Sequence, residues 1–334
     1  MVEQWLWQQW QQRGWFAALM FPVSLLYGRL AAWHRQSRTA LRRDTHLPVK
    51  AIIVVGNLTV GGNGKTPMTI WLALRLKGEG FRPGIISRGY GRRHAQQSTL
   101  VKPGADPDEV GDEPLLLARN TRVPVWVDRD RVRAALALAE RGVDIIIADD
   151  GFQHHRLPRD IAIVMVDGQR RFGNELCLPA GPLREPIDAL AEADFIVVNE
   201  GDTWPGEYAM RLVTADHARN LQDPKKRQRI TAWSGSPVHA VAGIANPERF
   251  FLALEAIGIS VIRHPFPDHY RFRPQDIMFN DPYPVLMTEK DAVKCARFAS
   301  LQHWYWPVVA RPEPQFEQAL IRRLQTCLRL NYLG

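Results

Sequence analysis

The sequence predicts an α/β protein whose mainly parallel sheet is covered by helices on both faces. Short, continuously apolar runs alternate with stretches of helical periodicity over most of the chain. This alternation is typical of a parallel sheet buried on both sides. The 334 residues are 46% hydrophobic and 23% charged, which excludes a disordered chain and a coiled-coil rod. We expect a smaller second α/β domain and an N-terminal amphipathic helical segment to complete the architecture.

The basic charge and the tryptophans are concentrated at the N-terminus. Residues 1–50 hold seven Lys/Arg and two acids, a balance of +5 out of the net +8, and five of the eleven tryptophans. The remaining chain is close to neutral, so we expect no nucleic-acid-binding face on the main body. The three cysteines, Cys177, Cys295 and Cys327, lie far apart without a CxxC pair. We therefore expect neither a disulfide framework nor a cysteine zinc site. We expect the protein to reside in a reducing compartment.

Residues 1–45 are predicted to form a membrane-associating segment. Fifteen residues from Gly14 to Gly28 carry no charge, which is short of the about 20 apolar residues of a bilayer span, and Pro22 interrupts them. Tryptophans beside an arginine cluster favour an interfacial helix or helical hairpin lying against anionic lipid. A helix packed on its own domain, a cleaved signal and a true span are the alternatives.

Residues 46–220 are predicted to form the first domain. Its expected helices cover residues 68–80, 113–120 and 131–142, and its expected strands cover residues 51–55, 84–86, 123–127, 143–148, 161–166 and 195–198. The chain turns polar around residues 215–230, where we expect the domain boundary. Residues 230–334 are predicted to form a smaller α/β domain that closes over the active site. Its expected strands are 238–244, 260–263, 285–288 and 308–310, with helices at 247–258 and 314–330. The sequence leaves open on which domain the last helix packs.

A glycine-rich loop between the first strand and the first helix is the sharpest functional signal. The string GNLTVGGNGKT, residues 56–66, approaches the GxxxxGK[ST] pattern of a P-loop, with Thr59 where the first glycine belongs. Backbone N–H groups in such a loop cradle phosphates, the lysine reaches the terminal phosphates and the threonine binds Mg²⁺. A chance GKT in a glycine-rich turn is the alternative. The expected nucleotide-binding residues of this P-loop NTPase-like fold are Thr59, Gly61, Gly62, Asn63, Gly64, Lys65 and Thr66.

Two carboxylates at the end of the expected strand 143–148 supply the second part of a nucleotide site. Asp149 and Asp150 leave a buried strand together, and two such acids repel each other unless a cation lies nearby. Asp149 is the better Mg²⁺ ligand because it is the first residue beyond the strand. A helix or turn cap is the alternative role.

The motifs in their order resemble those of the tetraacyldisaccharide 4′-kinase family over nearly the whole chain. Besides the P-loop, they are ISRGYGR (86–92), VGDEPLLLA (110–118), DDGFQHHRLPRD (149–160), LPAGPLREP (178–186), FPDHYRF (266–272) and TEKDAVK (288–294). The resemblance implies a kinase that uses ATP and Mg²⁺ to phosphorylate the 4′-hydroxyl of a tetraacylated disaccharide 1-phosphate, giving lipid IVA. It implies a peripheral enzyme at the cytoplasmic face of the bacterial inner membrane. Its expected partners are the membrane-embedded glycolipid substrate and anionic lipid, with no nucleic acid and no obligate protein partner.

The resemblance also implies an Asp–His pair in catalysis, which falls on Asp112 and His269. A carboxylate within reach of the sugar hydroxyl can accept its proton, and an imidazole can orient that carboxylate. The sequence leaves open which of the two takes the proton. The alternatives are a helix N-cap for Asp112 and a domain-interface histidine for His269. Because the two residues belong to different expected domains, the pair implies a cleft between them.

Further site residues are implied with less support from the residues themselves. Glu185 resembles a family acid near the metal, and its alternative is an ion pair with Arg184. Arg88 and Arg184 are candidates for the substrate's 1-phosphate or sugar, because guanidinium pairs well with phosphate. Tyr90 is a candidate to stack on sugar, and loop scaffolding is the alternative for all three. His154 and His155 are adjacent and point apart on a strand, so we expect no metal site there.

Two other functions compete with a kinase. A P-loop GTPase or metallochaperone would carry Asn-Lys-x-Asp after a late strand, and the string Thr288-Glu289-Lys290-Asp291 does not match it. A non-catalytic, membrane-associated ATP-binding scaffold would not need Asp112, Asp149, Asp150 and His269. The product formed from ATP and candidate acceptors distinguishes them, because only a kinase transfers phosphate to lipid.

Overall fold

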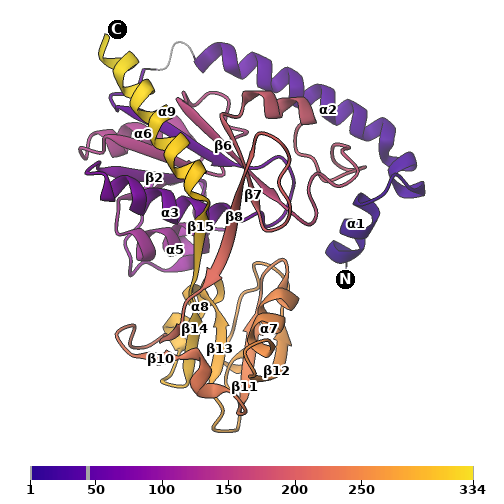
Figure 1. Ribbon diagram of the computed structural model, residues 1–334, viewed down its shortest axis with the longest axis vertical. Coiled ribbons are helices and arrows are strands. Elements are labelled where there is room, and N and C mark those ends of the chain that lie inside the picture. The colour runs from indigo at the N-terminus through magenta and orange to yellow at the C-terminus, as the bar shows by residue number, and fades with distance from the viewer. Residues whose placement is uncertain (1, 43–45, 334) are drawn as a thin grey trace.

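The computed structural model describes the backbone of residues 2–42 and 46–333 and the side chains of residues 5–40 and 46–330. It has two lobes, with an N-terminal helical arm on the first (Figure 1). The predicted α/β class is confirmed, because each lobe is built on a largely parallel sheet.

The first lobe is built on a nine-stranded sheet within the described residues. Its order is β15-β8-β7-β6-β1-β5-β2-β4-β3. The central strands are parallel, with Val55 of β1 beside Asp149 of β5 and Ile163 of β6. The bounds are β1 Ala51–Gly56, β2 Pro83–Ser87, β3 Thr99–Leu100, β4 Val125–Val127, β5 Ile145–Asp149, β6 Ile161–Asp167, β7 Phe195–Asn199, β8 Glu207–Thr214 and β15 Val308–Pro312.

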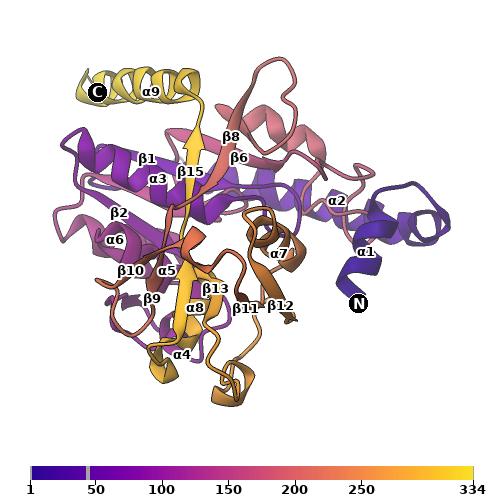
Figure 2. The same cartoon turned by 60° about the horizontal axis from the view of Figure 1, so that its bottom comes forward.

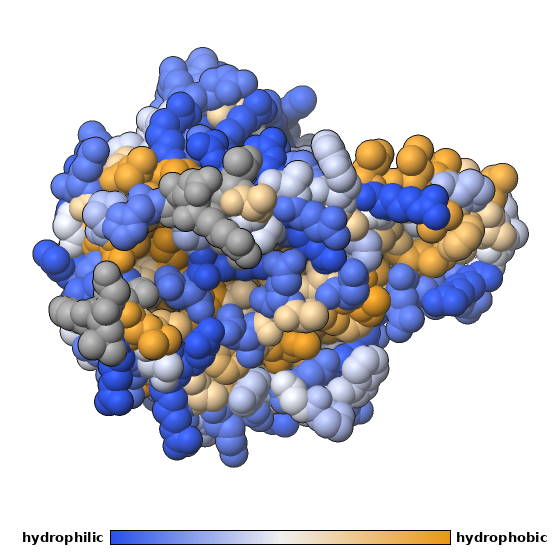
Figure 3. Space-filling model, turned by 90° about the horizontal axis from the view of Figure 1, so that it is seen from above, coloured by the Kyte–Doolittle hydropathy of each residue, from blue (hydrophilic) through white to orange (hydrophobic). Residues whose placement is uncertain are grey.

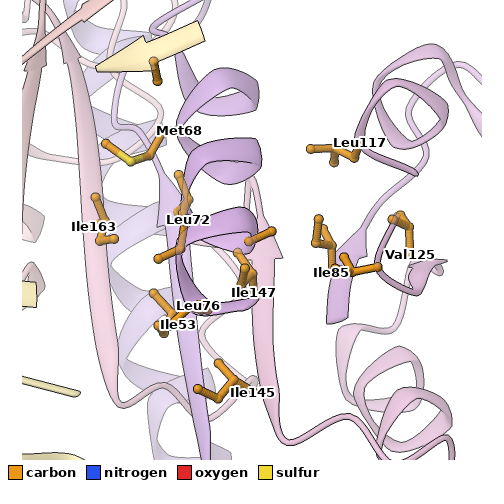
Figure 4. Close-up of a cluster of buried hydrophobic side chains, with 14 of the residues drawn as sticks. Ile53, Met68, Leu72, Leu76, Ile85, Leu117, Val125, Ile145, Ile147 and Ile163 are labelled. Atoms are coloured by element: carbon orange, nitrogen blue, oxygen red, sulfur yellow. The ribbon is translucent and has the colours of Figure 1, made fainter. Parts of the chain in front are cut away.

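Helices bury both faces of this sheet. On one face, Leu72 and Leu76 of α3 pack on Ile53, Ile147 and other strand residues (Figure 4). Helices α5 and α9 extend the same cluster, whereas α6 and η1 belong to a second cluster on the opposite face. The bounds are α3 Lys65–Gly78, α4 Pro107–Val110, α5 Asp112–Thr121, α6 Arg131–Ala139, η1 Ile187–Glu192 and α9 Pro314–Leu333.

The C-terminal elements differ from the sequence-based prediction. Strand β15, expected in the second domain, pairs antiparallel with β8 in the first sheet. The following helix α9 buries Phe316, Leu320 and Leu324 in the core of the first lobe and crosses its top (Figure 2). The local sequence of 308–310 is apolar in either location, and only its pairing partner decides the lobe. The first lobe is therefore discontinuous in the chain.

The second lobe contains a six-stranded sheet in the order β10-β9-β14-β13-β11-β12. Strands β9 and β10 lie in the polar stretch that was expected to be a boundary, and the sequence pattern also missed β14. The bounds are β9 His217–Asn220, β10 Arg227–Arg229, η2 Ile230–Trp233, β11 Pro237–Ala242, α7 Pro247–Glu255, β12 Ser260–Pro265, η3 Pro274–Asp276, β13 Val285–Thr288, α8 Glu289–Cys295, η4 Ala296–Phe298 and β14 His303–Trp306. The two crossings between lobes, β8 to β9 and β14 to β15, lie side by side, with a hydrogen bond from Ala215 N to Pro307 O of 3.0 Å.

The N-terminal arm consists of α1 (Val2–Trp10) and α2 (Trp15–Arg42). Pro22, which interrupts the charge-free run, does not end the helix, since α2 continues through it. Residues 15–40 are long and apolar enough to cross a membrane, by length and composition alone, although the shorter charge-free run suggested otherwise. One side of α2 is tied to the first lobe: Ser24 Oγ donates to Cys177 O at 2.7 Å and Tyr27 OH to Arg184 O at 3.0 Å.

The opposite side of α2 is apolar and exposed. Orange, hydrophobic residues gather along the arm that projects from the body (Figure 3). Besides the docked Tyr27, the large exposed apolar side chains of the helix are Trp15, Leu19, Phe21, Val23, Leu25, Leu26, Leu30 and Trp33. An isolated exposed Leu is ordinary, but a contiguous apolar face of this kind marks an interaction surface.

Candidate active site at the junction of the two lobes

The predicted P-loop joins β1 to α3. Gly61 and Gly64 have φ of +97° and +84°, a left-handed conformation that only glycine adopts without strain. Thr59, in the place of the usual first glycine, accepts a 2.7 Å hydrogen bond from Asn63 Nδ2, which closes the loop internally. The loop ends at the N-terminus of the 14-residue helix α3. Free backbone N–H groups and the helix dipole make this place suited to bind phosphate.

Lys65 links the P-loop to the acid pair. Its ammonium group donates to Asn57 Oδ1 at 2.9 Å and lies 3.0 Å from Asp150 Oδ1. Thr66 follows in the first turn of α3 and is partly buried. The structure thus brings Lys65 of the P-loop together with Asp150 of the acid pair.

Asp149 and Asp150 have opposite electrostatic surroundings. Burial, with the nearby charges of Glu113 and Asp150, raises the pKa of Asp149 to about 7. Its Oδ1 accepts a 3.0 Å hydrogen bond from Thr69. Burial opposes ionisation of Asp150 as well, but Lys65 and Arg184 hold its pKa below the usual range. A buried carboxyl that ionises with difficulty would be stabilised as the anion by a cation placed beside it.

Arg131 is a site residue that the sequence analysis missed. It is 3% exposed and donates from Nη2 to the carbonyl of Asp149 at 3.1 Å. Burial lowers the pKa of Arg131 to about 10. Its Nε atom is buried without a hydrogen-bond partner among the described residues. The only available signal was its place in the first turn of a helix that starts after a strand end.

Asp112 and His269 meet, as the resemblance implies. Asp112 begins α5 in the first lobe, and His269 lies in the loop after β12 in the second. His269 Nδ1 lies 3.3 Å from Asp112 Oδ2. The backbone of His269 is left-handed, with φ of +57°, which is uncommon for a residue with a side chain and often found at functional sites. Asp112 raises the pKa of His269.

Lys290 completes this charge cluster. Its Nζ lies 3.2 Å from Glu113 Oε1, 3.3 Å from Asp268 Oδ1 and 3.4 Å from His269 Nε2. Burial disfavours the ammonium, but Glu113 and the two nearby aspartates outweigh it and raise the pKa of Lys290. Despite burial, His269 and Lys290 together lower the pKa of Asp112 to about 2. Lys290 belongs to the motif TEKDAVK, but the motif alone did not predict a role for it.

A hollow of about 250 Å³ opens beside the pair. Tyr90 lines it, with its ring centroid 5.6 Å from that of His269. The other charged side chains at its wall are Asp108, Arg271, Lys294 and Arg297. Arg88 is exposed, and its charge contributes to the lowered pKa values of Arg131 and His154. Tyr90 therefore lies beside His269, whereas Arg88 acts on residues at the acid pair.

Arg184 and Glu185 occupy different surroundings. Arg184 donates to both oxygens of Asp150 at 3.1 and 3.2 Å, which places it at the acid pair and not in the hollow. Glu185 is buried, and its Oε1 contacts His155 Nε2 at 2.6 Å. Its Oε2 has no partner among the described residues. No group of three or more His, Cys, Asp or Glu side chains in the described chain is arranged to hold a metal by itself. His154 and His155 are therefore not part of such a group.

The chain matches the family model described as "Tetraacyldisaccharide-1-P 4'-kinase" over residues 16–325. The chain belongs to this family. Relatives named tetraacyldisaccharide 4′-kinase include a protein of Alkalilimnicola ehrlichii, 47% identical with 92% of each chain covered. Another, from Azoarcus sp., is 48% identical with 95% of this chain and 94% of the relative covered. A third, from Pseudomonas aeruginosa, is 44% identical with 93% and 94% covered.

Membership of this family also agrees with the fold. A crystal structure of LpxK from Aquifex aeolicus in complex with ATP has a TM-score of 0.76 and 28% identity, and the match covers 92% of this chain and 99% of that one. The predicted P-loop NTPase-like fold is thereby confirmed. As a member of the tetraacyldisaccharide-1-P 4′-kinase family, the protein is an ATP-binding phosphotransferase that phosphorylates a lipid A precursor.

Proposed function

We propose that the protein transfers the γ-phosphoryl group of ATP to the 4′-hydroxyl of tetraacyldisaccharide 1-phosphate, giving lipid IVA, with the transfer taking place between the lobes. The observation that carries this proposal is the contact of His269 with Asp112, at 3.3 Å, across the junction of the lobes. Glu113, the residue after Asp112, acts electrostatically on Asp149 of the acid pair. The two halves of the site are therefore within electrostatic reach of each other.

The P-loop half holds the donor. Residues from Thr59 to Gly64 supply backbone N–H groups for the phosphates, and Lys65 neutralises charge that develops on the transferred group. Arg184 and Arg131, which both contact the acid pair, add fixed positive charge on its two sides. These groups stabilise the transition state by position alone, because phosphoryl transfer requires little covalent chemistry from the protein.

His269 is the proton acceptor that the surroundings favour. A carboxyl with a pKa of about 2, as in Asp112, is a weak base at neutral pH, whereas the raised pKa of His269 brings it closer to the ideal for general-base catalysis. Asp112 accepts the Nδ1–H of the imidazole, and the Nε2 lone pair, which the Lys290 ammonium faces at 3.4 Å, becomes available to the sugar hydroxyl when the acceptor displaces Lys290. As the hydroxyl oxygen bonds to phosphorus, its proton passes to Nε2 and ADP leaves.

A magnesium ion fits the donor half. The carboxyl of Asp149 is buried and difficult to ionise, so a divalent cation would favour its anionic form. Mg²⁺ usually takes one or two protein ligands together with nucleotide phosphates and water, which agrees with the absence of a closed ligand cluster in the described chain. Thr66 and Asp149 would hold the ion, and Glu185 is a third candidate because its Oε2 is buried without a partner in the described residues. When bound, Mg²⁺ supplies neutralisation of phosphate charge.

The acceptor half suits a phosphorylated sugar. Tyr90 provides a ring on which a sugar face can stack, and Arg271, Lys294 and Arg297 line the same hollow as His269. Arg88 is a further exposed cation, whose charge acts on Arg131 and His154. The 1-phosphate of the acceptor is the natural partner of these groups. The exposed apolar face of α2 would rest in anionic lipid at the cytoplasmic face of the inner membrane, where the acylated substrate is held.

Product analysis tests this function. The full chain, in detergent micelles containing tetraacyldisaccharide 1-phosphate, is incubated with ATP and Mg²⁺, and the lipid is examined by mass spectrometry. We expect one added phosphate on the lipid with the natural protein and none with Lys65→Ala, because that variant loses charge stabilisation in the transition state. Release of inorganic phosphate with unchanged lipid would indicate an ATPase and overturn the proposal.

A further inference from the structure

Helix α1 of the N-terminal arm is docked on the first lobe beside the P-loop. Trp10, which is 7% exposed, donates its indole N–H to Pro179 O at 2.9 Å. The carbonyl of Trp10 accepts a hydrogen bond from Asn174 N at 2.7 Å. The helix precedes residue 16, where the match to the family model begins, so that match assigns it no role. Its docking therefore requires its own explanation.

Trp7, on the same helix, faces the P-loop together with Arg170. The guanidinium carbon of Arg170 lies 4.6 Å from the centroid of the Trp7 ring, which is a distance typical of a cation–π contact. A Cβ atom on Gly61 would come within 3.2 Å of Trp7 Cζ2 and 3.7 Å of Arg170 Nη1. The two side chains therefore cover the loop at Gly61, the first of its two glycines with positive φ.

Arg170 holds one peptide unit of this loop. Its Nη2 donates to Gly62 O at 3.3 Å and to Asp167 Oδ2 at 3.0 Å. Asp167 is the last residue of β6, so the guanidinium links the end of this strand to the loop. In a planar trans peptide the C=O and N–H bonds point in opposite directions. A Gly62 carbonyl held by Arg170 therefore directs the N–H of Asn63 away from Arg170, and such loop N–H groups are what phosphate binds.

We propose that Trp7 and Arg170 are positioning residues for ATP: the indole holds the guanidinium, and the guanidinium holds the P-loop in the conformation that accepts phosphate. Without either side chain, the loop populates this conformation less often, and the affinity for ATP falls by that fraction. The docking of α1 and the binding of ATP are then linked. Because such linkage is reciprocal, ATP also stabilises the docked state of α1.

A double-mutant cycle on ATP affinity tests the proposal. Calorimetry compares the natural chain, Trp7→Ala, Arg170→Met and the double variant, each as the full chain in micelles with Mg²⁺. We expect each single variant to bind ATP about fivefold more weakly or worse, the lower end of usual coupling between sites. The double variant should bind no more weakly than Arg170→Met alone, because either change breaks the same contact. Unchanged affinity in Trp7→Ala, or fully multiplicative losses, would overturn the proposal.

Inorganic tripolyphosphate and a matched tryptophan variant localise the effect. Tripolyphosphate, which has no base, should lose affinity by the same factor as ATP, and a loss confined to ATP would contradict a role in the phosphate loop. Trp5→Ala changes a tryptophan of the same helix that packs on Phe16 of α2, with ring centroids 5.3 Å apart, and should bind ATP as the natural chain does. Trp7→Phe keeps a ring for the guanidinium and should bind ATP more tightly than Trp7→Ala. Equal weakening in Trp5→Ala and Trp7→Ala would mean that the arm acts in general and not through Trp7.

Hydrogen exchange measures the reciprocal effect. Saturating ATP should slow exchange of the backbone amides of α1 in the natural chain and in Trp5→Ala, but not in Trp7→Ala. Exchange in α1 that ATP leaves unchanged in the natural chain would overturn the linkage. The proposal requires ATP binding and not a particular acceptor, so its failure would leave the proposed phosphoryl transfer to the lipid intact.

Discussion

Residues around His269 shift its pKa in opposite directions. Asp112, through its hydrogen bond, favours the imidazolium and raises the pKa of His269, whereas the ammonium of Lys290 opposes it. Glu113, Asp268 and Lys290 form the remainder of this cluster, with Tyr90 and Lys294 at its edge. The protonation state of His269 is therefore a property of residues from α5, α8 and the loop after β12 together.

Substitution of the pair should reveal that it acts as a unit. Asp112→Ala should lower kcat by about 10²–10⁴, the usual contribution of positioned acid–base groups. His269→Ala should cost a similar factor, and the double variant far less than the product of the two, because either change disables the pair. ATP affinity should change little. Single-turnover kinetics of the four proteins measure this, and fully multiplicative losses would contradict the assignment.

The pH profiles of two variants should shift in opposite directions. A base must be unprotonated, so activity falls as pH drops through its pKa. Asp112→Asn removes the contact that raises the pKa of His269, and the acidic limb of kcat should move to lower pH. Lys290→Met removes a cation that lowers that pKa, and the limb should move to higher pH. Lys290→Arg, which keeps the charge, should stay near the natural profile. Identical limbs in all variants would exclude His269 as the titrating base.

Sequence motifs predicted some residues of the candidate site and did not reveal others. The P-loop and the acid pair are local in sequence, so Lys65 and Asp149 could be assigned from spacing. Asp112 and His269 are far apart in the chain and were reached only through the family resemblance. Lys290 and Lys294 lie in the same motif and cannot be distinguished from the sequence. Only the fold shows that Lys290 is the one beside His269. Arg131 resembled any residue in the first turn of a helix.

At the scale of elements, helix α2 of the N-terminal arm has one side docked on the first lobe and an opposite side that is apolar and exposed. Ser24 and Tyr27 hold α2 to the first lobe, while Leu19, Leu26 and Leu30 are more than half exposed. Deleting the whole segment would remove both sides at once. Substitutions confined to the exposed side can therefore separate membrane attachment from support of the fold.

The triple variant Leu19→Ser, Leu26→Ser, Leu30→Ser should bind anionic vesicles more weakly with unchanged ATP affinity. Each lost Leu removes apolar area that would otherwise be buried in lipid. Co-sedimentation with vesicles in moderate salt measures the effect. The matched control changes Leu136, Leu252 and Leu301, which are exposed on other elements, to serine. Equal loss in both triple variants, or full sedimentation of the first, would place the attachment elsewhere.

Element types were easiest to predict where strands are buried on both faces. Strands β1, β5, β6 and β7 read as continuous apolar runs, and the prediction was confirmed. Strand β10 lies at a sheet edge, and β8 and β9 each lie next to an edge strand. Their sequences are mixed or polar, and local pattern did not reveal them. Strand β15 was recognised but placed in the wrong lobe, because a five-residue sequence does not determine which strand it pairs with.

For the whole molecule, the return of α9 couples the C-terminus to the stability of the first lobe. Phe316 is fully buried against Trp71, Phe195 and Tyr208. Phe316→Ala should lower the free energy of unfolding by about 3–5 kcal/mol, the usual cost of such a cavity. Leu330→Ala, an exposed position of the same helix, should stay within about 0.5 kcal/mol. Denaturant titration measures both, and an equal effect would mean that α9 does not complete this core.

The same return has a consequence during synthesis. The ribosome releases β1 to β8 first, then the entire second lobe, and only then the strand and helix that finish the first lobe. Until residues 308–330 emerge, the apolar surface formed by Ile161, Ile163 and Phe195 lacks part of its cover. Such a nascent chain is exposed to aggregation for as long as the second lobe is being made. A stop codon only a few dozen residues early would leave Asp112 and His269 present and the first sheet unfinished.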